Sequence, residues 1–304
     1  MNVTLVCVDA GGGHACGLSL GLRKYCNLTT VWENHNLHGL DHIEPQALFG
    51  FKHLPLTGDI LIIVSIVTIN ELEWFFEAEY NRFLRGYKQV KIIITNGKII
   101  EDPPLYNAKI KGMEVFAHLC KIAFRGGLPT KEYYQPFDLS HVEIKKNDKL
   151  TIAHSPFCDL KKVQKGTEEI EREVKKKYGD SVNLDVIIDT PWEEAMIRKA
   201  RSHLFIDQVY NSADRCGVNV DHHSIGKSGI EAMLLESLVF TRGEYIGRKI
   251  PAPPVVWIGR KNFIDLVDYY IEHPEEKEAK IKEQKEWALK YTTYDFASRN
   301  VLGI

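Results

Sequence analysis

The segment ILIIVSIVTI at residues 60–69 is the longest largely apolar run of the chain. Its ten residues are too few for a membrane-spanning helix, and its β-branched side chains favour a strand buried inside a parallel sheet. The run VKIIIT at 90–95 has the same character, and the segment 71–87 between them shows helical spacing of its apolar residues. A strand, a helix and a strand in this order form a βαβ unit, so the sequence predicts an α/β fold with a parallel sheet.

The same alternation runs through the whole chain in two series. The first series also contains strands expected at 2–8, 28–33 and 115–120 and a helix expected at 17–25. Segment 128–148, rich in proline, aromatic and charged residues, is interpreted as an interdomain connection. The second series has expected strands at 149–154, 183–189, 202–209 and 238–242 and expected helices at 167–179, 192–200, 227–237 and 262–273. We therefore expect two doubly wound domains, which face each other across a ligand-binding cleft.

Composition narrows the class of protein. A chain of 304 residues with 44% hydrophobic and 26% charged residues is typical of a globular enzyme of two domains. The net charge of -2 argues against electrostatic binding of nucleic acid by the whole molecule, although a local basic face stays possible. Six scattered cysteines without a C-x-x-C motif favour a reducing environment, and no signal peptide is recognised, so a cytoplasmic location without membrane association is expected.

The segment DHHSIGKSGIEAM at 221–233 enters a predicted helix through Gly226 and Gly229. Small residues at a helix start let backbone N–H groups approach an anion, and the helix dipole adds to the attraction. Glu231 follows about one turn into the helix, where a carboxylate can accept two ribose hydroxyls. A diphosphate could also contact the lysines that precede the helix at 167–179, namely Lys161, Lys162 and Lys165.

The order HSP, KGT before a helix, DVIID, FIDQ and G-x-x-G-I-E-A-M resembles the C-terminal half of GT-B glycosyltransferases, especially the retaining family-4 type, over residues 150–245. The resemblance implies a GT-B fold with an acceptor-side domain at 1–140, a nucleotide-sugar domain at 149–285 and a helix at 286–304 that crosses back to the first domain. It implies a nucleotide-sugar donor, no cofactor and no metal. The implied donor-binding residues are Gly12, Gly13, Lys161, Lys162, Lys165, Asp189, Trp192, Asp207, Gln208, His223, Gly226, Lys227, Ser228, Gly229 and Glu231.

The chain departs from this family at His223. Eight residues before Glu231, the family pattern E-x7-E has a first acidic residue that lies near the transferred sugar. The histidine leaves the identity of the sugar open and motivates the alternative of a degenerate nucleotide-sugar-binding protein. A metal site formed by Asp221, His222 and His223 is disfavoured, because no His pair with ligand spacing accompanies them.

The segment DAGGGHACG at 9–17 follows the first expected strand. Its glycines let the backbone approach a ligand, and in a two-domain enzyme this loop would face the donor from the acceptor side. His14 and Asp9 are the candidate catalytic residues there. A dinucleotide fingerprint is incomplete because Cys16 stands where its last glycine belongs, and a P-loop at IGKS lacks its first glycine because position 221 is Asp.

These sequence features lead to one leading hypothesis for the function and to several alternatives. The leading hypothesis is a metal-independent, retaining glycosyltransferase whose acceptor is a hydroxymethylated pyrimidine in DNA, as for phage-encoded enzymes. The alternatives are a polysaccharide or lipid-linked acceptor, a sugar-nucleotide epimerase of the same fold, and the degenerate binding protein. A DNA acceptor would contact basic residues of the first half, namely Lys91, Lys98, Lys109, Lys111, Arg125 and Lys131.

Overall fold

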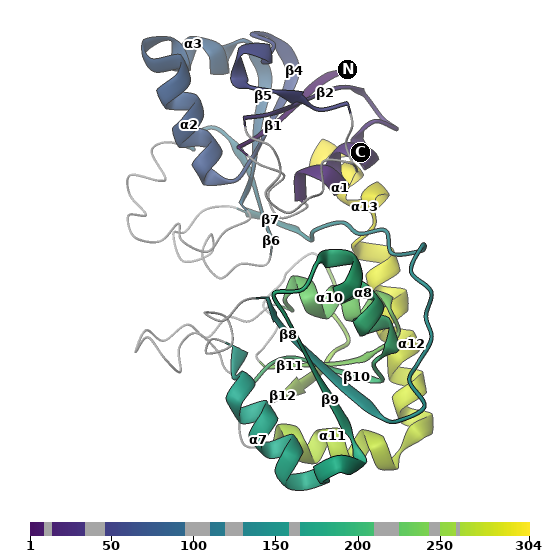
Figure 1. The fold of residues 1–304 in the computed structure, drawn as a ribbon. Helices are drawn as coiled ribbons and strands as arrows, with labels where there is room; N and C mark the ends of the chain where they lie inside the picture. Colours follow the sequence, from purple (N-terminus) through teal and green to yellow (C-terminus); the bar gives the residue numbers. More distant parts are fainter. Residues whose placement is uncertain are drawn as a thin grey trace. The chain divides into compact units, whose positions relative to one another are not determined.

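The computed structural model describes residues 1–8, 14–33, 46–94, 110–118, 130–157, 165–209, 225–242, 250–259 and 262–304. The chain forms two compact units, one of Met1–Phe137 together with Thr292–Ile304, and one of Asp138–Tyr291. Each unit is built on a parallel sheet with helices on both faces (Figure 1). The predicted doubly wound α/β architecture is therefore confirmed.

The sheet of the first unit has the strand order β3-β2-β1-β4-β5-β6-β7, and its paired strands are parallel. Its central strands are apolar on both faces: Leu5 and Ile62 contribute to one core cluster, and Val6 and Ile63 to the other. This explains why the first half of the apolar run at 60–69 forms a strand, which ends at Val64. The second half of the run was predicted wrongly as strand, because helix α2 begins at Ile66. The strands are β1 (Asn2–Cys7), β2 (Asn27–Trp32), β3 (Leu48–Phe49), β4 (Gly58–Val64), β5 (Tyr87–Ile94), β6 (Glu114–His118) and β7 (Thr130–Tyr133).

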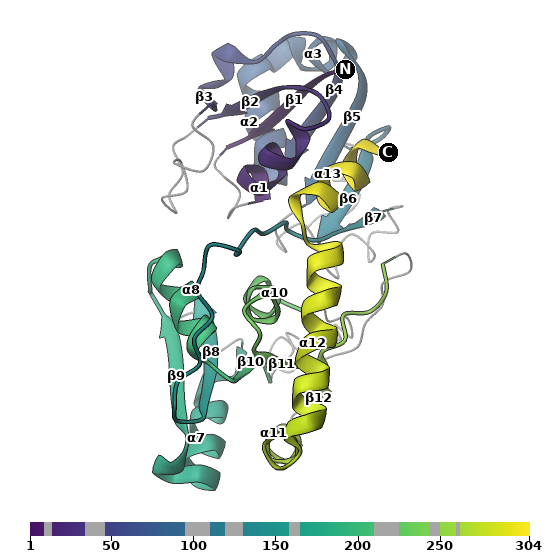
Figure 2. The same ribbon diagram turned by 90° about the vertical axis from the view of Figure 1, so that its right-hand side faces the viewer.

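Among the residues of this unit that the structure describes, four α-helices cover the sheet. α1 (His14–Leu22) and α13 (Tyr294–Leu302) lie on one face, and α2 (Ile66–Phe76) and α3 (Tyr80–Arg85) lie on the other (Figures 1 and 2). α1 and α13 approach closely at Gly21, where a Cβ would lie 2.2 Å from the Tyr294 carbonyl oxygen. Glycine at this position is thus required for the last helix to dock on the first.

The second unit has the strand order β12-β11-β10-β8-β9, with parallel pairs throughout. α7 and α11 supply apolar side chains to the core on one face of the sheet, while α8 and α10 contact each other and the other face. The strands are β8 (Thr151–Phe157), β9 (Asn183–Ile188), β10 (Leu204–Gln208), β11 (Leu238–Arg242) and β12 (Val256–Ile258). The helices are α7 (Thr167–Tyr178), α8 (Trp192–Arg201), α10 (Lys227–Leu234), α11 (Phe263–Glu272) and α12 (Pro274–Tyr291).

The structure differs from the sequence-based prediction at one expected connection and at two expected helices. The expected interdomain connection at 128–148 contains strand β7 at its start, and the expected helix 71–87 is divided by a short 3-10 turn at Glu77–Glu79. The helix expected at 286–304 is two helices. α12 ends at Tyr291 in the second unit, and Thr293 caps α13 by accepting a hydrogen bond from the Phe296 N–H at 3.2 Å.

Candidate functional site

The second unit has a topological switch point between β8 and β10. From β8 the chain adds β9 on one side, and it then returns to place β10 on the other side of β8. In doubly wound sheets, ligands bind at the carboxyl ends of the two strands that flank such a point. Lys165 follows β8, and Asp207 and Gln208 end β10, so three of the predicted donor-binding residues lie there.

Lys165 and Asp207 form an ion pair across the switch point. Lys165 Nζ lies 2.8 Å from Asp207 Oδ1 and donates to the Ser155 carbonyl at 3.1 Å. Burial raises the pKa of the Asp207 carboxyl, but the Lys165 ammonium and the Gly226 N–H outweigh burial and hold that pKa below its usual range. Asp207 is fully buried and ionised, and it fixes the position of the Lys165 ammonium.

The start of α10 is attached to the same carboxylate. The Gly226 N–H donates to Asp207 Oδ2 at 2.8 Å, and a Cβ on Gly226 would lie 2.8 Å from that oxygen, so a side chain has no room there. Lys227 and Ser228 form the first turn, where a helix offers its own N–H groups no acceptor. This end of α10 therefore presents N–H donors and the positive end of the helix dipole.

Glu231 lies one turn further along α10 and is buried among three donors. Its Oε2 is 2.5 Å from Lys199 Nζ, its Oε1 accepts from the Trp192 indole at 3.2 Å, and Lys227 Nζ is 3.9 Å from Oε1. Burial raises the pKa of the Glu231 carboxyl, but the nearby Lys199 and Lys227 ammonium groups hold that pKa below its usual range. The carboxylate that was predicted from sequence to bind ribose is thus ionised and oriented by α8.

The five charged groups of this site favour an anion. Among the described residues of the site, the ammonium groups of Lys165, Lys199 and Lys227 outnumber the carboxylates of Asp207 and Glu231 by one. Lys227 is the most exposed of the five, with 36% of its side chain accessible, so this end of α10 carries a cationic side chain near the surface. Together with the N–H groups of α10, this arrangement suits a phosphate group.

The segment after β9 carries two further predicted residues, Asp189 and Trp192. Asp189 is exposed and has a φ of 46°, a conformation that costs a non-glycine residue roughly 1–3 kcal/mol. Arg198 fixes the neighbouring chain, because it pairs with Asp185 and donates to Thr190 Oγ1 at 3.2 Å. The strained turn is thereby held at the carboxyl end of β9.

His154 joins three elements beneath the site. Its Nδ1 is 2.6 Å from the Ile206 carbonyl oxygen and must donate the hydrogen bond, because a carbonyl only accepts. Its Nε2 then accepts from the Thr167 hydroxyl at 2.9 Å. The neutral imidazole therefore connects β8, β10 and the start of α7.

His154 also predicts a pH dependence of stability. Burial lowers its pKa from 6.5 to about 4, so between these values the unfolded chain binds a proton that the folded chain does not. The free energy of unfolding should therefore fall by about 2 kcal/mol between pH 7 and pH 5 through this group. In urea unfolding at both pH values, His154→Gln should lose this part of the pH dependence, and the exposed His273→Gln should keep it. An unchanged dependence in His154→Gln would contradict this account of His154.

The first unit has its own switch point, between β1 and β4. His14 begins α1 after β1, is buried, and has its ring centroid 5.8 Å from that of Tyr133. After β4, Ser65 has a φ of 80° and precedes α2, and Thr68 Oγ1 accepts from the Val8 N–H at 3.3 Å. A strained serine and a histidine thus lie at the end of the sheet where ligands bind.

Sequence reasoning missed Lys199, Ser65 and Thr68. Lys199 was detectable, because it lies on the side of α8 that carries Met196 and Ala200, where a lysine is unexpected. Several predicted residues lie outside the described part of the chain, namely Asp9, Gly12, Gly13, Lys161, Lys162 and His223. Among the described residues, no helix is long and apolar enough to cross a membrane, and no cluster of three potential metal ligands occurs.

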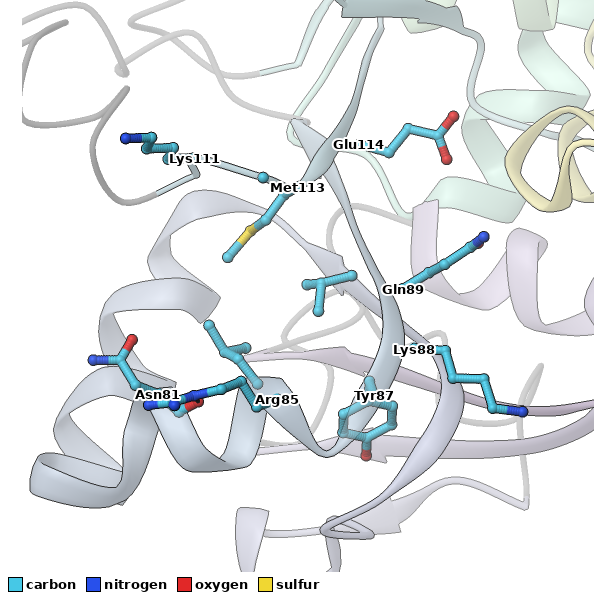
Figure 3. Close-up of a pocket in the computed structure, with 11 residues that line it drawn as sticks. Asn81, Arg85, Tyr87, Lys88, Gln89, Lys111, Met113 and Glu114 are labelled. Carbon is cyan, nitrogen blue, oxygen red and sulfur yellow. Dashed lines mark hydrogen bonds between the residues drawn. The ribbon is translucent and has the colours of Figure 1, made fainter.

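A separate surface pocket of about 680 Å³ lies on the first unit, at the amino ends of β5 and β6. Figure 3 shows Asn81 and Arg85 on one wall and Lys111 and Met113 on another, while Glu114 points away. In parallel sheets, ligands bind at the carboxyl ends of the strands, so this pocket is distinct from the switch point of the first unit.

The architecture of the two units is the GT-B fold, as the chain's similarity to solved structures shows. HepE of Anabaena in complex with UDP is 11% identical, with a TM-score of 0.64 over 100% of this chain and 99% of that one. An alpha-glucosyltransferase in complex with UDP and a DNA containing an HMU base is also 11% identical, with a TM-score of 0.64 over 100% and 98%. Sucrose-phosphate synthase from Thermosynechococcus elongatus is 9% identical, with a TM-score of 0.60 over 98% and 96%.

No protein-family model and no curated protein sequence matches the chain. At identities near 10%, the similarity to solved structures establishes the fold alone. The function must therefore be argued from the chain's own residues.

Proposed function

We propose that this chain is a glycosyltransferase that moves a sugar from a nucleoside-diphosphate sugar to an acceptor hydroxyl. The observation that carries this proposal is the switch point of the second unit, where Lys165, held by Asp207, and the N–H groups of α10 form an anion site. Glu231, a carboxylate suited to a ribose diol, lies one turn along the same helix. In this proposal the second unit binds the donor and the first unit binds the acceptor.

The reaction requires stabilisation of the leaving group. As the bond between the anomeric carbon and the phosphate oxygen breaks, negative charge accumulates on the nucleoside diphosphate. Lys165 and the N–H groups of Lys227 and Ser228 would stabilise that charge, and Asp207 would act by orienting Lys165. Fixed protein cations and dipoles can supply this stabilisation without a metal ion.

The stereochemistry and the catalytic group belong to the same proposal. The sequence resemblance to family-4 enzymes supports retention, with the acceptor attacking on the face that the diphosphate leaves. His14 is the described candidate for the catalytic group of the first unit, and Asp9 is a second. With inversion this group would be the general base for the acceptor hydroxyl, and with retention it would act beside the transferred sugar.

UDP-glucose is the donor to test first. HepE was solved with UDP-glucose, and the alpha-glucosyltransferase with UDP, so two proteins of this fold hold a uridine nucleotide. In the present chain, the strained turn at Asp189 lies after β9, where family members contact the base. These points support a uridine nucleotide.

DNA with a hydroxymethylated pyrimidine is the proposed acceptor, supported by the structural similarity to the alpha-glucosyltransferase bound to DNA. The structure of the first unit limits which of its predicted basic residues could contact DNA phosphates. Lys91 is 3% exposed and lies 2.8 Å from Glu114, and Lys131 pairs with the same carboxylate. Lys111 is exposed and is the described lysine of the predicted basic set that stays available for phosphate. A polysaccharide or lipid-linked acceptor is the alternative.

The decisive experiment incubates the protein with radiolabelled UDP-glucose, with DNA containing 5-hydroxymethyluracil, with unmodified DNA, or without DNA. Label on the hydroxymethylated DNA alone would support the proposed enzyme and acceptor. Release of UDP without labelled DNA would support a glycosyltransferase with another acceptor. Conversion of UDP-glucose to an epimer would support the epimerase, and binding without turnover would support the degenerate binding protein.

A further inference from the structure

Lys199 is a buried ammonium group that has no role in the proposed reaction as described above. It lies on α8 and is 2% exposed, and its Nζ is 2.5 Å from Oε2 of Glu231, which is 3% exposed. Figure 1 draws α8 and α10 side by side, and the two helices are in contact. Burying a charge is costly unless a partner compensates it, so each of these two residues requires the other.

The two contacts from α8 constrain the carboxylate of Glu231 at both oxygens. Lys199 donates to Oε2, and the Trp192 indole donates to Oε1 at 3.2 Å. Each carboxylate oxygen can accept two hydrogen bonds, so the contacts from α8 leave each oxygen one further acceptor position. Two such positions on one carboxylate match the two neighbouring hydroxyls of a ribose.

Lys227 differs from Lys199 in burial and distance. Its Nζ is 3.9 Å from Oε1, beyond hydrogen-bond reach, and 36% of its side chain is exposed. A ligand hydroxyl can therefore replace Lys227 at Glu231 without leaving a buried charge unpaired. Lys199 has no such freedom, because it is 2% exposed and its separation from Glu231 would leave both charges buried and unpaired.

We propose that Lys199 is a positioning residue that holds the Glu231 carboxylate in place to accept both hydroxyls of the donor's ribose. This inference rests on the proposed function. Selection of ribonucleotides over nucleotides that lack these hydroxyls would then depend on α8, a helix outside the α10 motif. Lys199 itself does not touch the donor.

The test compares the dissociation constants of UDP and 2′,3′-dideoxy-UDP by calorimetry. Hydrogen bonds to a charged group are worth about 1.5–3 kcal/mol, so the wild type should prefer UDP by about 30-fold or more. In Lys199→Met the preference should fall to about 3-fold or less, mostly through weaker UDP binding. Lys199→Arg, which keeps the charge, should recover part of it, and Arg201→Met on the exposed side of the same helix should leave it unchanged.

The ratio of the two constants separates positioning from a merely structural role. Unfolded protein binds neither nucleotide, so partial unfolding lowers both affinities and leaves the ratio unchanged. If Lys199→Met does not fold, the double variant Lys199→Met with Glu231→Gln removes both buried charges and should also show a preference near 3-fold or less.

Two results would count against this role. Wild-type preference in Lys199→Met or in the double variant would overturn it. Equal binding of the two nucleotides by the wild type would also overturn it and would leave the proposed diphosphate site intact. Absence of UDP binding by the wild type would instead overturn the proposed function on which the inference depends.

Discussion

Replacing Lys165 by methionine is expected to weaken UDP binding by about 100-fold. The Lys165 ammonium lies at the carboxyl end of β8, where it is 17% exposed and fixed by Asp207. A charge-assisted contact to a phosphate is worth about 1.5–3 kcal/mol, and the loss of positive charge beside the remaining carboxylate adds repulsion. Calorimetric titration with UDP measures the effect, and turnover of UDP-glucose should fall with it.

Lys165→Met removes the ion-pair partner of Asp207, so this variant needs a control for the effect of the unpaired carboxylate. Removing one member of a buried pair costs about 3–5 kcal/mol of stability, because Asp207 would stay buried without its cation. The double variant Lys165→Met with Asp207→Asn removes both charges and keeps an acceptor for the Gly226 N–H. It should fold and still bind UDP weakly, whereas Lys175→Met, exposed on α7, should bind UDP normally. Wild-type turnover by the Lys165 variant would refute the donor site.

Replacing His14 by alanine is expected to lower the rate of sugar transfer by about 100-fold or more while UDP affinity changes less than about 3-fold. A positioned acid–base group contributes about 10²–10⁴-fold to a rate. His14 lies in the first unit, at the switch point between β1 and β4, and the proposed diphosphate site lies in the second. Transfer kinetics and UDP titration of the same preparation separate the two effects.

His53 provides the matched control, because it is an exposed histidine of the same unit. His53→Ala should show wild-type transfer and wild-type binding. Equal loss of transfer and nucleotide binding in His14→Ala would indicate that the segment 9–17 binds a nucleotide itself, as in a cofactor-binding domain.

The strands that the sequence predicted well are those with apolar residues on both faces. β4 and β5 are such strands, because each contributes side chains to both core clusters of the first unit. β3 and β12 have two and three residues, too few to show a period. β7 is an edge strand, and its sequence TKEY is mostly polar. Its composition therefore does not indicate a strand.

The site was predictable where its residues form one continuous motif. Gly226, Lys227 and Glu231 belong to a single stretch that opens α10, and the glycine is explained by its approach to Asp207. Lys199 lies 32 residues before Glu231 in the sequence and meets it only through the packing of α8 on α10. A single lysine on a helix resembles a solvated residue until the neighbouring helix is placed.

In the proposed enzyme, the second unit binds a nucleoside diphosphate at the switch point between β8 and β10. The most direct test is calorimetric titration of the wild-type protein with UDP, GDP, ADP and inorganic phosphate. We expect saturable binding of at least one nucleoside diphosphate, at least about 10-fold tighter than phosphate, and about 100-fold weaker binding of that nucleotide by Lys165→Met. Failure of all three nucleotides to bind at millimolar concentration would contradict it.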